Sequence, residues 1–220
     1  GVERPCGMRV LYICPSSLIK NVIGEFRKWA PHRSVVPIGN MPESMRDFAF
    51  DTAQGQDEFV MLLNYEAWRF KKDTLISKLV QLNFDSIIID EAHSIKDTRT
   101  TAYAGIEELT KRSKIEFILP MTGTPILNKP ADLYPLLQLI MPDRFYSKKR
   151  FLEEFCEQDY ASGRWVFKPG GEKRLRNQLG KKYLRRTTSD AGIELPEQTV
   201  QVHSLKVDLE AYPAQASARR

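Results

Sequence analysis

The sequence has few cysteines and no long apolar run. None of its apolar stretches approaches the ~20 residues that a membrane-spanning helix needs, and its start lacks the apolar core of a signal peptide. The three cysteines, Cys6, Cys14 and Cys156, are an odd and scattered set without metal-ligand spacing. These absences argue against membrane proteins, disulfide-rich secreted proteins and zinc fingers. We expect reduced thiols in an intracellular protein with no membrane partner.

The sequence also lacks a P-loop, the phosphate-binding pattern Gly-x-x-x-x-Gly-Lys-Ser/Thr. Its one Gly-Lys pair, Gly180-Lys181, is followed by Lys182, and Leu175 stands where the first glycine would be. The backbone amides and the lysine that cradle nucleotide phosphates in such a loop are therefore absent from these 220 residues.

The composition is that of a soluble globular protein. Apolar residues make up 42% and charged residues 28% of the chain. Its length of 220 residues is enough for a sizeable core. The net charge of +5 permits an anionic partner such as nucleic acid. Charge alone fits a mildly basic soluble protein without such a partner equally well.

Apolar segments rich in β-branched residues alternate with helical patterns along residues 8–142. Strands that read as continuous apolar runs are typical of sheets covered on both faces. We therefore predict an α/β fold, a parallel sheet with helices on both faces, and an irregularity at Pro135. The predicted strands lie in residues 8–15, 34–38, 58–68, 84–90 and 114–123, and the predicted helices in residues 18–30, 99–112 and 130–142.

The pattern changes after about residue 145. Residues 147–158 read as a helix, residues 161–174 as a loop, and residues 195–209 show the alternation of a strand. The last ten residues are small and polar and are expected to fray.

Asp90 and Glu91 directly follow the apolar run of residues 86–89. Ligands of open α/β sheets bind outside the carboxyl ends of the strands. A carboxylate there can hold Mg²⁺ through water and substrate phosphates, and a second one can orient or deprotonate an attacking water. The alternative is a helix N-cap, in which Asp90 caps and Glu91 favours the helix dipole. The segment by itself leaves both interpretations open.

Two further segments follow predicted strand ends. Thr122, Gly123 and Thr124 follow the last strand, and their hydroxyls would lie beside His93 if the two strands are neighbours; the alternative is a plain turn. Ser16 and Ser17 precede the first helix, where hydroxyls and backbone amides can bind phosphate. The alternative there is simple helix capping by either serine.

Four segments in this order resemble motifs Ia, Ib, II and III of the superfamily-two helicase-like ATPases. They are "CPSSLIKNVIGEFRKW", "LLNYE", "IIIDEAHSIKD" and "MTGTPILNKPADLYPLLQLIMP". More narrowly, they resemble the Swi/Snf-type branch, the DNA translocases of chromatin remodelling and fork repair. The resemblance implies a RecA-like lobe of the P-loop NTPase type, ATP and Mg²⁺ as cofactors, and double-stranded DNA as partner.

The resemblance also implies roles for the motif residues. Asp90 would bind the Mg²⁺ of MgATP, and Glu91 would activate the hydrolytic water. His93, which would otherwise be a satisfied core histidine, would couple nucleotide state to lobe movement together with Thr122, Gly123 and Thr124. The residues expected to contact the DNA backbone are Ser16, Ser17, Lys20, Asn64 and Tyr65.

In that family the P-loop precedes motif Ia, and a second RecA-like lobe with an arginine finger follows the first. The resemblance therefore implies that residues 1–145 are the core of a first helicase ATP-binding lobe. Residues 146–200 would be a helical and loop extension of that lobe. Residues 201–220 would begin a linker to the second lobe. We expect this chain to be inactive without the P-loop segment and second lobe of its DNA-associated parent.

Two classes of function remain open from the sequence. The first is part of an ATP-dependent double-stranded DNA translocase, with a strand-separating helicase or a restriction-type motor as variants. The second is a non-enzymatic nucleic-acid or protein-binding adaptor that kept the lobe. The intact Asp90, Glu91 and His93 favour the motor, because an adaptor has no chemical need for them.

Overall fold

The structure, a computed structural model, describes residues 8–39, 41–69, 72–124 and 129–186, together with Asp190 and Gly192. The chain divides into two compact units, Gly1–Gln178 and Leu179–Arg220. The described part of the second unit contains one turn of 3-10 helix, Gly180–Lys182. The predicted strand pattern of residues 195–209 and the predicted linker lie outside the described residues.

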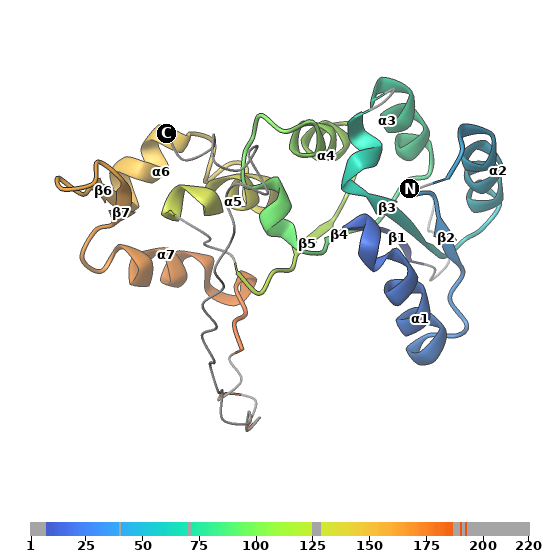
Figure 1. Cartoon of the computed structure of the whole chain (residues 1–220), viewed down its shortest axis with the longest axis horizontal. Coiled ribbons are helices and arrows are strands. Elements are labelled where there is room, and N and C mark those ends of the chain that lie inside the picture. The colour runs from blue at the N-terminus through green and yellow to red at the C-terminus, as the bar shows by residue number, and fades with distance from the viewer. Residues whose placement is uncertain are drawn as a thin grey trace, which may run out of the picture. The chain divides into compact units, whose positions relative to one another are not determined.

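The first unit is built on a five-stranded parallel sheet with strand order β2-β3-β1-β4-β5 (Figure 1). All five predicted strands are present, although each is shorter than its apolar run. The predicted α/β parallel sheet is therefore confirmed. The strands are β1 (Arg9–Cys14), β2 (Val35–Pro37), β3 (Phe59–Asn64), β4 (Ser86–Ile89) and β5 (Phe117–Pro120).

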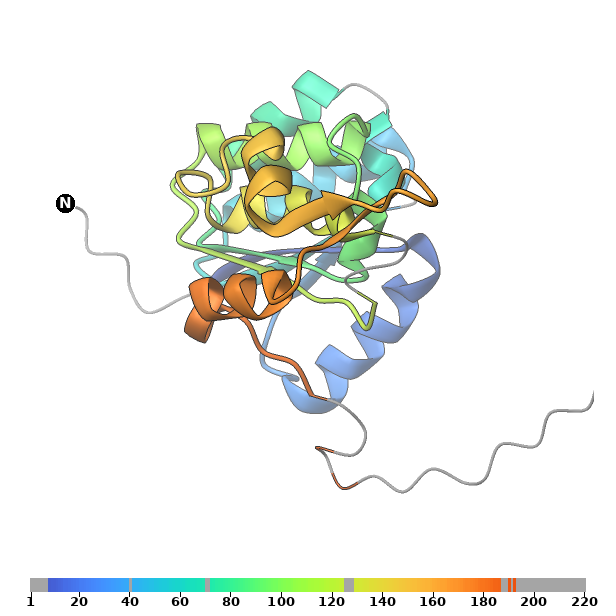
Figure 2. The same ribbon diagram turned by 90° about the vertical axis from the view of Figure 1, so that its left-hand side faces the viewer.

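Helices cover both faces of this sheet, as predicted (Figure 2). Among the described residues, α1 packs against one face and four helices pack against the other. Two of those four, α2 and α3, were not anticipated from the sequence. The helices are α1 (Ile19–Trp29), α2 (Glu43–Gln54), α3 (Lys72–Gln81), α4 (Thr101–Arg112) and α5 (Tyr134–Ile140).

The predicted helix of residues 130–142 begins as a 3-10 turn, Pro130–Leu133, and continues as α5. Pro135 lies in the first turn of α5, where a missing N–H costs no intrahelical hydrogen bond. The expected irregularity is thus the change of helix type just before Pro135.

The region after residue 145 differs from its prediction in two places. The predicted helix of residues 147–158 ends at Phe155, because residues 156–158 pair with residues 165–167 as an antiparallel ribbon. The segment predicted as a loop contains one strand of that ribbon and the start of a helix. The elements are α6 (Lys148–Phe155), β6 (Cys156–Gln158), β7 (Trp165–Phe167) and α7 (Gly171–Leu179).

The sheet brings the candidate residues to one edge. Parallel pairing aligns Ile13 with Ile89 and Cys14 with Asn64, and Ile89 pairs with Pro120. The segments that follow β1, β3, β4 and β5 therefore leave the sheet at its carboxyl edge. No helix in the described residues is long and apolar enough to cross a membrane.

Candidate active site at the carboxyl edge of the sheet

Asp90 is held at the end of β4 by hydrogen bonds to both its backbone and its carboxylate. Its backbone N–H donates to the Ile13 carbonyl at 2.8 Å and so extends the ladder with β1 by one residue. Its carboxylate accepts from the Glu91 backbone N–H at Oδ1 and from the Tyr12 hydroxyl at Oδ2, both at 2.9 Å. The side chain therefore has a defined orientation, with both oxygens engaged.

Glu91 adopts the left-handed backbone conformation, with φ 49° and ψ 49°. This conformation costs roughly 1–2 kcal/mol for a residue with a Cβ. The chain then enters a 3-10 helix, Ala92–Ile95, and no side chain of the described residues caps its N-terminus. The N-cap interpretation of this segment is therefore wrong, because the Asp90 carboxylate bonds only the first N–H of a strained turn.

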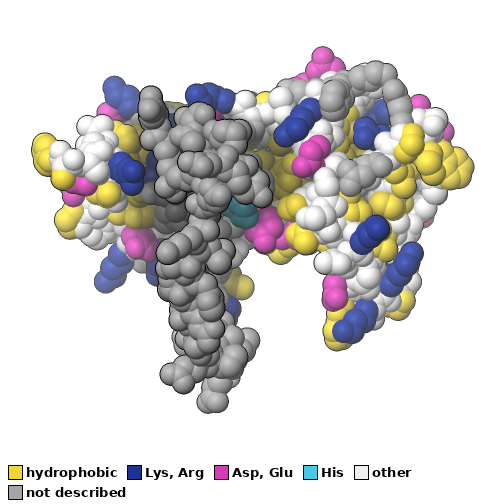
Figure 3. Space-filling view, viewed as in Figure 1, with side chains coloured by type: hydrophobic (Ala, Val, Ile, Leu, Met, Phe, Trp, Pro, Cys, Tyr) yellow, Lys and Arg dark blue, Asp and Glu magenta, His cyan; other side chains and the backbone are white. Residues whose placement is uncertain are grey.

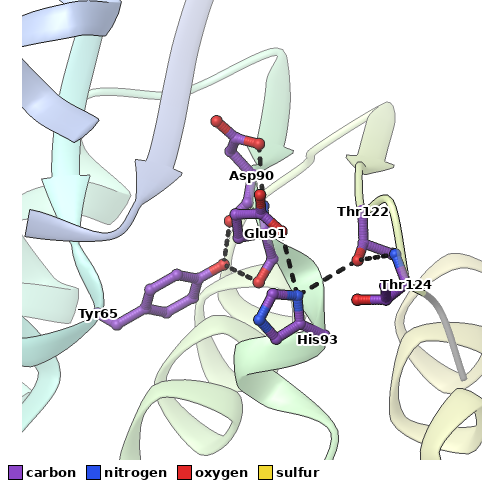
Figure 4. A network of polar contacts seen from close by, with 6 residues as sticks. All are labelled: Tyr65, Asp90, Glu91, His93, Thr122 and Thr124. Carbon is purple, nitrogen blue, oxygen red and sulfur yellow. Dashed lines mark hydrogen bonds and ion pairs between the residues drawn. The ribbon is translucent and has the colours of Figure 1, made fainter. Parts of the chain in front are cut away.

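The His93 side chain contacts residues that follow β4 and β5 (Figure 4). Its Nδ1 lies 3.1 Å from a Glu91 carboxylate oxygen and 3.3 Å from the Thr122 hydroxyl. The Ala92 N–H also donates to the Met121 carbonyl at 2.9 Å, which fixes the spacing of the two segments. The predicted proximity of His93 and Thr122 is confirmed. The His93 side chain is 32% exposed, so it is not a core residue.

Gly123 and Thr124 show no side-chain hydrogen bond to Glu91 or His93 among the described residues. Both are exposed, and Thr124 joins the network only through its backbone N–H, which donates to the Thr122 hydroxyl at 3.1 Å. Thr122 is therefore the only member of this group whose hydroxyl reaches His93 among the contacts of the described residues.

Tyr65 belongs to the carboxylate site. It begins the 3-10 helix Tyr65–Arg69, and its hydroxyl donates to the Asp90 carbonyl at 2.6 Å and lies 3.4 Å from the Glu91 carbonyl (Figure 4). Burial and the charge of Asp90 raise the pKa of Tyr65, so the hydroxyl keeps its proton and acts as a donor. The contact of Tyr65 with DNA stays a prediction, and the structure adds that its hydroxyl is already used inside the protein.

Ser16 is part of a polar network after β1. Its hydroxyl donates to a Glu66 carboxylate oxygen at 2.7 Å and accepts from the Asn64 side-chain amide at 2.9 Å. The bond from Ser16 lowers the pKa of Glu66. The prediction that Ser16 or Ser17 caps a helix is wrong: Pro15 precedes a 3-10 turn, and neither hydroxyl bonds the first amides of α1 within the described residues.

The remaining candidate DNA contacts differ in their exposure. Asn64 is 2% exposed, so its amide supports Ser16 from inside, and this burial corrects the prediction of a direct DNA contact. Ser17 and Lys20, in contrast, are exposed at the start of α1. Ser17, Lys20 and the half-buried Ser16 therefore present side chains that a phosphate backbone could reach.

A cleft of about 280 Å³ lies beside β1 and α1, and its lining includes Tyr12, Val22, Phe26 and Asp90. The described residues contain no cluster of three or more His, Cys, Asp or Glu that could hold a metal ion. A single carboxylate suits Mg²⁺, which keeps several waters and binds through substrate phosphates. Asp90 is therefore of the residue type that fits a Mg²⁺ bound through nucleotide phosphates.

Comparison with protein families finds that the model of the SNF2-related domain matches residues 6–214. The chain belongs to this SNF2-related family. It is 30% identical over 193 residues to an uncharacterised ATP-dependent helicase of Mycoplasma genitalium, and this match covers 86% of the chain and 18% of the relative. It is 29% identical over 185 residues to the ISWI chromatin-remodeling complex ATPase of Saccharomyces cerevisiae, with 84% and 15% covered. The chain thus spans less than a fifth of the length of these SNF2 relatives.

Solved structures give the same family. The SWI2/SNF2 ATPase core of Sulfolobus solfataricus in complex with double-stranded DNA matches with a TM-score of 0.63 at 26% identity, over 84% of this chain and 35% of that one. The SWI2/SNF2 ATPase core domain of the same organism matches with a TM-score of 0.60 at 25% identity, over 84% of this chain and 34% of that one. The fold is therefore that of an SNF2-type, RecA-like ATPase lobe, as predicted.

Proposed function

We propose that this chain is the greater part of the first lobe of an SNF2-type motor that couples ATP hydrolysis to movement along double-stranded DNA. The observation that carries the proposal is the arrangement of Asp90, Glu91, His93 and Thr122 at the carboxyl edge of the sheet. Two carboxylates with different partners, on neighbouring residues, suit two different tasks in phosphoryl transfer to water.

Each of the two carboxylates would have a different role in hydrolysis. Asp90 would hold the Mg²⁺ of MgATP through water, and that ion would supply charge neutralisation at the phosphates. Glu91 would accept a proton from the attacking water. His93 contacts the Glu91 carboxylate at 3.1 Å and the Thr122 hydroxyl at 3.3 Å. A movement of the Glu91 side chain would therefore be transmitted through His93 to the segment after β5.

The phosphate cradle is the part that these residues do not supply. No P-loop occurs in the 220 residues, and we propose that the chain by itself hydrolyses no ATP. We further propose that residues 1–145 form the lobe core, residues 146–200 its extension, and residues 201–220 the start of a linker. This arrangement requires that a P-loop segment and a second lobe act together with this chain.

The proposal predicts that duplex DNA stimulates the ATPase of the full-length protein. Steady-state ATP hydrolysis should rise at least tenfold on addition of duplex, and the 220-residue chain should show none under the same conditions. A triplex-displacement assay should show ATP-dependent movement along the duplex. Hydrolysis that no nucleic acid stimulates would overturn the motor and favour the adaptor. Activity of the isolated chain would overturn its dependence on a P-loop.

Lys20 is exposed in the first turn of α1, the helix that follows β1 at the carboxyl edge of the sheet. The other basic side chains on the face shown in Figure 3 are scattered over it. We expect Lys20→Ala to weaken duplex binding and to reduce the slope of log K against log salt by about 0.9, the value of one released counterion. Lys28→Ala is the matched control, since it removes the same charge from the opposite end of α1. Fluorescence anisotropy at several salt concentrations measures both. Equal salt slopes for the two variants would contradict a specific contact between Lys20 and a DNA phosphate.

A further inference from the structure

Two tyrosine hydroxyls hold the Asp90–Glu91 turn from different elements. Tyr12 reaches it from β1, and Tyr65 reaches it from the 3-10 helix after β3. The roles assigned to the site above use neither hydroxyl. Each hydroxyl bonds a different part of the turn, which separates their effects: Tyr12 bonds a side chain, whereas Tyr65 bonds the main chain.

Tyr12 fixes the carboxylate of Asp90. With Oδ1 taken by the Glu91 N–H at 2.9 Å, the Tyr12 hydroxyl at Oδ2 leaves the carboxylate a single favoured orientation. Tyr12 is itself restrained, because β1 pairs with β4 beside it and its ring packs edge-on against Phe26 at 6.1 Å. A carboxylate that is already oriented loses less freedom when it takes up a metal ion, which is the usual effect of an outer hydrogen bond on a ligand.

Tyr65 fixes the backbone on both sides of Glu91. Its hydroxyl lies 2.6 Å from the Asp90 carbonyl and 3.4 Å from the Glu91 carbonyl, so it contacts the peptides that flank the left-handed residue. A strained conformation persists only where its surroundings over-determine it. Without this hydroxyl, the Glu91 backbone can relax toward φ < 0, which turns the carboxylate away from His93.

We propose that Tyr12 and Tyr65 are positioning residues with separable effects: Tyr12 orients the metal-binding carboxylate, and Tyr65 maintains the backbone that aims Glu91. The inference rests on the proposed ATPase function of this site. It assigns Tyr12 to metal affinity and Tyr65 to the rate of the chemical step.

The test compares Tyr12→Phe and Tyr65→Phe in the full-length protein with a matched control, Tyr103→Phe. Tyr103 is 2% exposed, and its hydroxyl donates to Gln138 at 2.8 Å, so this control loses a buried hydrogen bond of the same kind outside the turn. Tyr12→Phe should raise the Mg²⁺ concentration for half-maximal hydrolysis roughly tenfold, with kcat at saturating Mg²⁺ unchanged. Tyr65→Phe should lower kcat about tenfold, with the Mg²⁺ requirement and the KM for ATP unchanged.

Two measurements without turnover accompany the kinetics. Mn²⁺ binding in the presence of ADP, followed by the EPR signal of free Mn²⁺, should weaken roughly tenfold in Tyr12→Phe only. Amide hydrogen exchange of residues 91–93, followed by mass spectrometry in the 220-residue chain, should accelerate in Tyr65→Phe only. The melting temperature of each variant is compared with that of Tyr103→Phe. This comparison shows whether the loss of stability exceeds the loss caused by removing one buried hydrogen bond.

The outcomes separate the two proposals. A wild-type protein without ATPase activity would overturn the proposed function, and the Mn²⁺ and exchange measurements would still decide the positioning roles. An active wild type with both variants matching Tyr103→Phe would overturn the positioning roles alone. Variants that each change metal affinity and kcat together would contradict the separation of the two effects.

Discussion

Replacing Glu91 with Gln in the full-length protein is expected to lower DNA-stimulated kcat by roughly 10²- to 10⁴-fold. The amide keeps the size of the carboxylate and can still contact His93, whose Nδ1 lies 3.1 Å from a Glu91 carboxylate oxygen. It cannot accept a proton from water at neutral pH. The KM for ATP and the affinity for duplex DNA should stay within about twofold, because binding does not need the proton transfer.

The control for this prediction is Glu107→Gln. Glu107 forms an ion pair with Lys111 at 3.0 Å on α4, so this variant loses the same charge away from the turn. Its kcat should match the wild type. A Glu91→Gln enzyme that retained kcat within a factor of ten, or that lost activity only through a raised KM, would contradict the assignment of Glu91 as the proton acceptor.

Replacing Gly105 with Ala is expected to lower the free energy of unfolding by about 3 kcal/mol, the upper end for overpacking a core. Gly105 lies in α4 against Trp68, and a Cβ there would lie 2.2 Å from a carbon of the indole ring. Trp68 is fully buried, so its ring cannot swing into solvent to make room. The helix or the 3-10 turn that carries Trp68 must move instead.

Gly24→Ala is the matched control, because it makes the same change inside a helix where no described atom lies within 4 Å of the new Cβ. It should raise the free energy of unfolding by roughly 1 kcal/mol, since alanine favours a helix more than glycine does. Urea denaturation of the 220-residue chain measures both variants. Two variants shifted in the same direction would contradict the role given to the Gly105–Trp68 contact.

This packing contact also bears on the active site. Trp68 and Tyr65 belong to the same 3-10 helix, so a displacement that relieves the clash at Gly105 also moves the hydroxyl that holds the Asp90 carbonyl. Gly105→Ala is therefore expected to lower kcat in the full-length protein even where the protein remains folded. The core of the lobe and the geometry of Glu91 depend on the same short segment.

The sequence by itself determined the sheet and the position of the carboxylates. A strand that is buried on both faces must be a continuous apolar run, and this local pattern is readable without a structure. Because Asp90 directly follows such a run, its place at the carboxyl edge was predictable, as was the meeting of His93 with Thr122 once β4 and β5 were taken as neighbours. The order of the four motifs predicted the family.

Tertiary structure alone decided how these residues are held. The Tyr12 hydroxyl meets Asp90 across 78 positions of sequence and the Tyr65 hydroxyl across 25, and no local pattern records such a pairing. The Tyr65 hydroxyl contacts both carbonyls that flank the left-handed Glu91, and the Ser16 hydroxyl bonds Glu66 instead of a helix end. Both contacts join different elements. Local propensity predicts which elements form, whereas hydrogen bonds between distant segments choose the partner of each polar side chain.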